Sequence, residues 1–283
     1  MPDLIVVGTD GSDCADLAVD WAAGEAVRRG GRLHIVHAVE GWPLKVPRLA
    51  PPDAGERVRR AGLRVLEDAE RRVRTRHPAL ETTTALATED TAAALRKQSE
   101  GAFELVLGSR GHGGFADLLL GSTGLKAVAH SEIPVVIVRG ETDDRGEVVV
   151  GLDLDRNPGN SLRYAFETAS VRGARLRIVH AWQVYPTAAE VGATPDVETM
   201  EAELRSRVAA AYAPLRDHHP GVDAVDEVVL EHPVTALVNA SRNACLVVVG
   251  EHPHSRVMPR FWSVGHGTVH HARCPVAVVP DPG

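Results

Sequence analysis

The chain of 283 residues repeats itself, and this repeat limits its fold more than any other feature. The segment VVGTDGS at residues 6–12 returns as VVGLDLD at 149–155, and RLHIVHA at 32–38 returns as RLRIVHA at 175–181. Near the end of each copy, SEIPVVIV at 131–138 is matched by ARCPVAVV at 272–279. Because the three segments recur in the same order, the sequence predicts two copies of one domain, at residues 1–140 and 147–283.

The composition narrows the classes of function. The formal net charge is −7, whereas nucleic acids and anionic membranes attract proteins with a basic field, so we expect neither as a partner. The sequence has no run of about 18 apolar residues, and its first residues do not resemble a signal peptide. Three scattered cysteines are too few for a disulfide framework. We therefore expect a cytoplasmic protein.

Each copy alternates short runs of apolar, β-branched residues with longer stretches of helical period. This alternation is typical of an α/β domain whose parallel sheet is covered by helices on both faces. Each copy is thus predicted to be a flavodoxin/Rossmann-like domain, and Ser12 or Asp13 is predicted to cap the first helix. The predicted strands are residues 4–8, 33–38, 82–87, 105–108 and 135–138 in the first copy, and 148–152, 176–181, 226–230, 246–250 and 276–279 in the second.

A glycine-rich segment follows the fourth predicted strand of the first copy. Glycines let the backbone come close to a ligand, and the free N–H groups and dipole at the start of a helix favour phosphate. Ser122, at the start of the next predicted helix, can donate to a phosphate oxygen or cap that helix. The glycines of this segment are Gly108, Gly111, Gly113, Gly114 and Gly121.

The glycine spacing alone leaves alternatives open. The segment is not a P-loop, because no lysine precedes Ser122, and no G-x-G-x-x-G follows the first strand. A glycine-rich surface loop without a ligand fits the same residues. Asp10 favours a ligand, because it lies at the carboxyl end of the first predicted strand, where open parallel sheets bind ligands. The switch point between the first and fourth strands is expected to bring it beside Gly108.

Together, the motifs resemble the universal stress protein family in its tandem, two-domain form. The resemblance covers nearly the whole chain, once in each half. In that family the G-x-x-G-x(9)-G-[ST] pattern marks members that bind ATP, so the resemblance implies ATP as the cofactor, alone or with Mg²⁺. The motifs are V-V-G-T-D-G-S, H-I-V-H-A, G-x-x-G-x(9)-G-S and H-x-x-x-P-V-V-I-V.

The resemblance implies roles for residues of the first copy. The motif glycines and Ser122 would surround the ribose and phosphates, Asp10 would hold the nucleoside end, and Ala38 would present its backbone to adenine. Thr9 would line the same cleft, and Arg110 would either pair with phosphate or remain solvated. The ATP-binding residues implied are Thr9, Asp10, Ala38, Gly108, Arg110, Gly111, Gly121, Ser122 and Thr123.

The second copy departs from this pattern. Pro253 stands at the position of Gly111, and proline has no backbone N–H and a fixed φ. Trp262 stands at the position of Gly121, and its bulky side chain would occupy the space that a phosphate needs. Asp153 matches Asp10 and persists. We therefore expect the second domain to keep the fold but to bind nucleotide weakly or not at all, with Trp262 and the preceding phenylalanine filling its cleft.

Histidines are further candidates for chemistry. His266 and His270 have the i, i+4 spacing of a zinc pair, but no acidic residue or cysteine shares that helix face, so we expect no metal. His37 and His180 occupy the same strand position in both copies, which indicates a role in the fold. No Ser-His-Asp order, carboxylate pair or H-E-x-x-H is recognisable, so we expect no catalytic residues.

Three functions fit these observations. The first is a non-enzymatic, ATP-binding stress-response protein with slow hydrolysis at most. The second is a nucleotide hydrolase or nucleotide-transferring enzyme on the same fold, although no S-G-G-x-D-S loop follows the first strand. The third is a ligand-free tandem scaffold. The resemblance also implies that the last strands of the two domains pair in an intramolecular pseudo-dimer, and that two chains associate as a homodimer.

Overall fold

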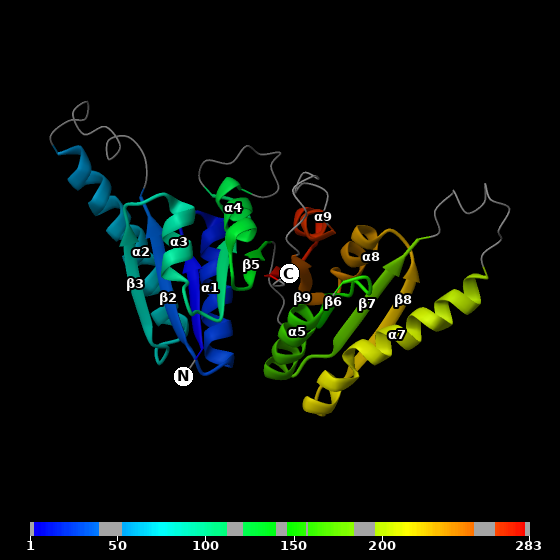
Figure 1. Ribbon diagram of the computed structural model, residues 1–283. Helices are drawn as coiled ribbons and strands as arrows, with labels where there is room; N and C mark the ends of the chain where they lie inside the picture. The colour runs from blue at the N-terminus through cyan, green and yellow to red at the C-terminus, as the bar shows by residue number, and fades with distance from the viewer. Residues whose placement is uncertain are drawn as a thin grey trace. The chain divides into compact units, whose positions relative to one another are not determined.

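The chain divides into two compact units, residues 1–142 and 143–283. The computed structural model describes residues 3–39, 53–111, 121–139, 146–156, 158–183, 196–251 and 264–280. Each unit has its own sheet and its own helices, labelled in Figure 1. Within the described residues, no helix is long and apolar enough to cross a membrane.

The first unit contains a parallel sheet with the strand order β3-β2-β1-β4-β5. Helices α1 and α2 pack against each other, as do α3 and α4. Right-handed crossovers on either side of β1 place these two pairs on opposite faces of the sheet. The strands are β1 (Leu4–Gly8), β2 (Arg32–Ala38), β3 (Thr82–Ala87), β4 (Glu104–Gly108) and β5 (Val135–Val138), and the helices are α1 (Asp13–Arg28), α2 (Ala54–Arg76), α3 (Thr91–Gln98) and α4 (Ser122–His130).

The second unit repeats this architecture, with the strand order β10-β9-β6-β7-β8. Helix α5 packs on α7, and α8 packs on α9. The predicted fold class is therefore confirmed in both halves. The strands are β6 (Glu147–Gly151), β7 (Leu176–Trp182), β8 (Ala224–Leu230), β9 (Ala244–Glu251) and β10 (Val276–Pro280), and the helices are α5 (Gly159–Arg172), α7 (Val197–His218), α8 (Pro233–Ala240) and α9 (Val264–His271).

The ends of the strands lie within two residues of their predicted positions. β1, β3 and β5 coincide with the prediction, whereas β8 and β9 begin two residues before it. β6 begins at Glu147, one residue before its predicted start, and it ends at Gly151 rather than at the predicted Leu152. Glu147 is accommodated in the strand because its carboxylate pairs with Arg177 of β7 at 2.6 Å. A charged residue can thus belong to a strand when the neighbouring strand supplies its partner.

A buried ion pair lies at the end of α1. Glu25 has no exposed surface, and its carboxylate accepts hydrogen bonds from Arg29 Nε at 2.7 Å and from Arg28 Nη1 at 3.3 Å. The Arg29 guanidinium also lies over the ring of Phe103, 3.8 Å from its centroid. These contacts join the end of α1 to the residue that precedes β4. A buried charge that loses its partner is strongly destabilising, so α1 depends on this pair.

We expect Glu25→Gln to lower the free energy of unfolding by about 3 kcal/mol, because the buried Arg29 guanidinium loses the carboxylate that lies 2.7 Å away, whereas its other acidic partner, Asp3, lies farther away at 3.7 Å. Urea denaturation measures this change. Glu56→Gln is the matched control, since Glu56 pairs with Arg60 at the same i, i+4 spacing but on the exposed surface. The control should leave the free energy of unfolding nearly unchanged, because an exposed ion pair contributes little to stability. Equal losses in the two variants would contradict this interpretation.

The end of β4 passes very close to the start of α1. A β-carbon on Gly108 would lie 2.6 Å from the carbonyl oxygen of Cys14 and 3.0 Å from the backbone nitrogen of Ala15. Backbone atoms cannot rotate away as a flexible side chain can, so only glycine fits at this position. Around Gly121, in contrast, a β-carbon would meet no atom of the described residues within 4 Å. The two glycines belong to one motif but have different packing environments.

We expect Gly108→Ala to lower the free energy of unfolding by about 2 kcal/mol, because β4 or α1 must shift to admit the methyl group. Gly121→Ala should cost less than about 1 kcal/mol, since the space beside it is open and only its helix-capping preference changes. Chemical denaturation of both variants tests the difference. A similar cost at both positions would show that the close approach at Gly108 is easily relieved.

Candidate functional site

Two segments meet at the carboxyl edge of the first sheet because β1 and β4 are neighbours. Gly8 is in register with Leu107, so the residues that follow β1 lie next to those that follow β4. A β-carbon on Gly111 would collide with Oδ2 of Asp10, which places this glycine directly against the carboxylate. The strand order therefore brings Asp10 and the glycine motif into contact, although about 100 residues of sequence separate them.

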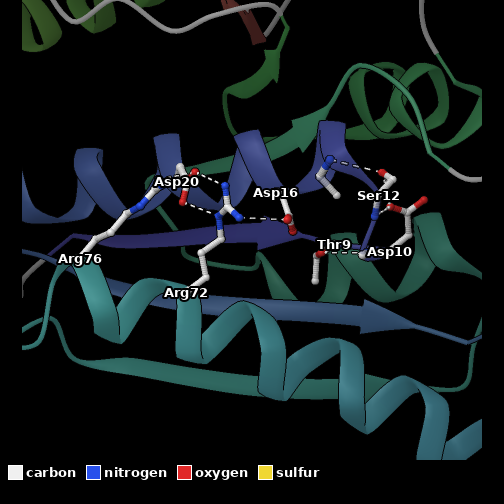
Figure 2. A network of polar contacts seen from close by, with 9 residues as sticks. Thr9, Asp10, Ser12, Asp16, Asp20, Arg72 and Arg76 are labelled. Atoms are coloured by element: carbon white, nitrogen blue, oxygen red, sulfur yellow. Dashed lines mark hydrogen bonds and ion pairs between the residues drawn. The ribbon is translucent and has the colours of Figure 1, made fainter.

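The segment after β1 is a tightly bonded turn, shown in Figure 2. The backbone N–H of Ser12 donates to Oδ1 of Asp10 at 3.0 Å, and the Ser12 hydroxyl donates to the same oxygen at 2.6 Å. Ser12 also caps α1, because its Oγ accepts from Ala15 N at 3.3 Å. Gly11 has a φ of +78°, in the left-handed region that favours glycine. The turn thus fixes the direction of the Asp10 carboxylate.

A histidine on the second strand anchors this turn in both units. Nδ1 of His37 donates to the carbonyl oxygen of Thr9 at 2.7 Å, and Nδ1 of His180 donates to that of Leu152 at 2.9 Å. A carbonyl oxygen can only accept, so the proton lies on Nδ1 in both rings. Because the same bond recurs in both halves, these histidines hold the fold, in agreement with the expectation from the sequence.

The glycine segment is closed at its base by a backbone bond. Gly121 N donates to the carbonyl oxygen of Ser109 at 3.1 Å, and Ser109 N donates to that of Val138 at 2.9 Å. Gly121 is the N-cap residue of α4, and no described side chain caps that helix start. The start of α4 is therefore held beside the end of β4, and none of the described residues fills the space next to Gly121. Residues 112–120, which include Gly113 and Gly114, lie outside the described residues.

The other predicted ATP-binding residues are distributed around this edge. Ala38 ends β2 and directly follows His37, which bonds to the turn after β1. Thr9 is buried, and its backbone N–H donates to Val36 O at 2.9 Å. Arg110 is exposed. Ser122 and Thr123 form the first turn of α4.

A polar network between α1 and α2 was not found from the sequence. Arg72 of α2 bonds to Asp20 through Nε at 2.7 Å and Nη2 at 2.6 Å, and its Nη1 lies 3.1 Å from Asp16 (Figure 2). Arg76 also pairs with Asp20. The hydrogen bonds that Arg72 donates to Asp20 raise the pKa of the guanidinium above its usual value. The network holds together the two helices on one face, and α1 starts at the Asp10 turn. In the sequence, only the acidic residues in the first half of α1 and the basic residues at the end of α2 indicate this network.

The second unit has a cavity at the corresponding edge of its sheet. It has a volume of about 580 Å³ and lies at the carboxyl ends of β6, β7 and β9. Asp153, one of its lining residues, accepts a hydrogen bond on Oδ1 from Asp155 N at 3.0 Å, the same turn that Asp10 forms with Ser12. The prediction that Trp262 fills this cleft concerns a residue outside the described part of the chain. The described residues leave a space of ligand size.

The paired histidines of α9 lie close together. The ring centroids of His266 and His270 are 4.2 Å apart. Burial, and then the positive charge of His271, lower the pKa of His266 below its usual value. Among the described residues, no group of three His, Cys, Asp or Glu side chains is arranged to hold a metal ion.

Known proteins match the chain over nearly its whole length. A model of the universal stress protein family matches residues 1–139 and again residues 145–280. A universal stress protein of Mycobacterium tuberculosis (strain H37Rv) is 30% identical over 309 residues, covering 98% of this chain and 95% of the relative. One from Mycolicibacterium smegmatis is 28% identical over 256 residues, with 88% and 86% covered.

A solved structure of the same family has the same fold. The universal stress protein of Archaeoglobus fulgidus matches with a TM-score of 0.72 over 99% of both chains, at 17% sequence identity. The repeated α/β units and the two matches to the family model lead to one conclusion: the chain belongs to the universal stress protein family and contains two copies of its domain.

Proposed function

We propose that the first unit binds ATP, alone or with Mg²⁺, and that the protein is a nucleotide-responsive stress protein rather than a fast enzyme. The observation that carries this proposal is the contact between Gly111 and the Asp10 carboxylate at the carboxyl edge of the sheet. The glycine motif and the aspartate turn thereby form one site, and they are the two elements that the family resemblance relates to the nucleotide.

The geometry divides this site into two chemically different ends. The Asp10 carboxylate is an acceptor, and the hydroxyl groups of a ribose are donors suited to it. At the other end, the start of α4 presents free N–H groups and the positive end of the helix dipole, which favour phosphate. The described residues leave the space beside Gly121 open, which supports a phosphate group at this helix start.

The same residues give little support for fast catalysis. The motif lacks the lysine of a P-loop, and the described residues include no cluster of three potential metal ligands that would hold a catalytic cation in place. The positioning groups that phosphoryl transfer needs are therefore not recognisable around Asp10. We infer that the occupancy of the site by nucleotide, and not its turnover, changes the protein surface.

We expect ATP to raise the Tm of the protein while single-turnover assays show negligible hydrolysis over one hour. At 100 times its Kd, a ligand that binds only the folded state contributes about 2.7 kcal/mol, which corresponds to a shift of several degrees. Differential scanning fluorimetry and phosphate release measure the two quantities. Rapid turnover would favour the enzyme alternative, and an unchanged Tm would favour the ligand-free scaffold.

We expect Gly121→Trp, which copies the residue of the second half, to abolish the ATP-induced shift. The reason is that the indole occupies the open space at the start of α4, so the fold itself should be preserved. Gly221→Trp is the matched control, because a β-carbon there also meets nothing within 4 Å and the residue lies in a turn of the other unit. If Gly121→Trp retains the full shift, the phosphate site lies elsewhere.

We further propose that β5 and β10 pair with each other within one chain, as an intramolecular pseudo-dimer, and that two such chains associate as a homodimer. Within its own unit each strand lies at one end of the strand order, and each is apolar and short. Terminal strands carry unpaired backbone groups that attract another strand. Light scattering after size exclusion measures the number of chains in the particle: we expect two, and a monomer would contradict the homodimer.

A further inference from the structure

A groove lies between α3 and α4 of the first unit, and its volume is about 270 Å³. This volume is slightly below the usual range of ligand pockets, so the groove suits a small molecule. Leu105 of β4 and Ala127 of α4 are buried and give it apolar surface, and Ala92 of α3 adds a small side chain. None of the ATP-binding residues implied by the family resemblance is among its described lining residues. The α3–α4 groove is therefore distinct from the proposed nucleotide site.

Two cations from different helices line the α3–α4 groove. Arg96 belongs to α3 and Lys126 to α4, and both are exposed. Among the described residues, neither has an acidic partner within ion-pair distance. Lys97, the neighbour of Arg96 in the sequence, does have such a partner, because its Nζ lies 3.2 Å from a carboxylate oxygen of Glu89. The formal net charge of the chain is −7, so two cations that share a groove without a carboxylate partner point to an anion from outside the chain.

The other titratable groups that line the groove are already engaged with the backbone. Asp90 caps α3, because its Oδ1 accepts from Ala93 N at 3.2 Å. His130 donates from Nδ1 to the carbonyl oxygen of Lys126 at 3.0 Å. Arg96 follows Asp90 by six residues, which is about 9 Å along a helix. The one acidic lining residue is therefore at the far end of α3 from the cation, and it does not neutralise the groove.

The second unit shows that the fold requires neither the groove nor its cations. Val238 and Gly267 stand at the positions of Arg96 and Lys126. A β-carbon on Gly267 would lie 2.8 Å from a methyl carbon of Val234, so α8 and α9 approach each other closely where the first unit has its groove. The two units otherwise share their strand order and helix pairs. The α3–α4 groove and its two charges are thus particular to the first unit.

We propose that the α3–α4 groove binds a small aliphatic dicarboxylate, with one carboxylate at Arg96, the other at Lys126 and the carbon chain along the apolar lining. A guanidinium binds a carboxylate through two parallel hydrogen bonds, and an ammonium binds it as a point charge. The apolar lining favours an anion that carries a carbon chain, because a bare inorganic ion would lose water there without gaining hydrogen bonds. This site goes beyond the proposed nucleotide function and does not depend on it.

Succinate is the probe, and backbone amide NMR spectra of the full-length chain at low salt are the measurement. The resonances of α3 and α4 should shift and saturate during the titration, whereas those of α8 and α9 should not move. Unmoved α3 and α4 resonances, or equal shifts in α8 and α9, would overturn the proposal. Gly121→Trp should bind succinate as the wild type does, so a failure of ATP binding would leave this inference standing.

Arg96→Gln and Lys126→Gln each remove one of the two charges. Each should lower the affinity for succinate about tenfold, because one charge-assisted contact is lost. Both residues are exposed, so the Tm without ligand should stay unchanged. Lys97→Gln is the matched control, since it removes the same charge from α3 but does not line the groove, and it should retain the full affinity. An equal loss in the control would show a general effect of charge and would overturn the assignment.

Ala92→Val tests the shape of the groove while both charges remain. Val234 stands at this position in the second unit, so the change copies a side chain that the fold accepts there. Succinate binding should be lost, and retained binding would place the ligand outside the groove. Propionate, with one carboxylate, should bind the wild-type chain about tenfold more weakly than succinate. Inorganic phosphate that binds as tightly as succinate would show that any anion is accepted, and it would overturn the proposed ligand class.

Discussion

The parallel pairing of β1 with β4 is the constraint on which the rest of the first unit depends. It places the turn after β1 next to the segment after β4, so that Asp10 contacts Gly111. The pairing also sets how closely β4 approaches α1, and Gly108 is the residue that permits this approach. The α1–α2 network around Arg72 and the buried Glu25 pair then hold α1 from two sides. The pairing of β1 with β4 therefore determines both the packing of β4 against α1 and the geometry of the candidate site.

The second unit retains the scaffold of the site but changes its chemistry. The pairing of β6 with β9, the aspartate turn and the histidine anchor are all repeated, because each of them stabilises the fold irrespective of a ligand. The glycines that a phosphate would need are replaced in the sequence, and Trp182 introduces a polar group where the first unit has valine. A duplicated domain can change its ligand in this way, because the fold requires only part of the site. The remaining positions are free to diverge.

The sequence predicted the architecture well, because ten apolar β-branched runs and their repeat leave few alternative folds. It was less informative where a residue depends on a distant partner. Glu147 extends β6 through Arg177, and the bonds of Arg72 reach 52 and 56 residues back along the chain. The packing role of Gly108 depends on the distance between β4 and α1, which no local pattern encodes. That the buried Nε1 of Trp182 has no hydrogen-bond partner among the described residues becomes visible only once the surroundings of its side chain are known.

We infer that duplication produced two unequal sites, only one of which recognises a triphosphate. Equilibrium dialysis of the wild-type chain against labelled ATP tests this inference directly, because it counts bound nucleotides per chain without assuming where they bind. We expect one ATP per chain at saturation. Two equivalent ATP sites per chain would contradict it, and so would the absence of any.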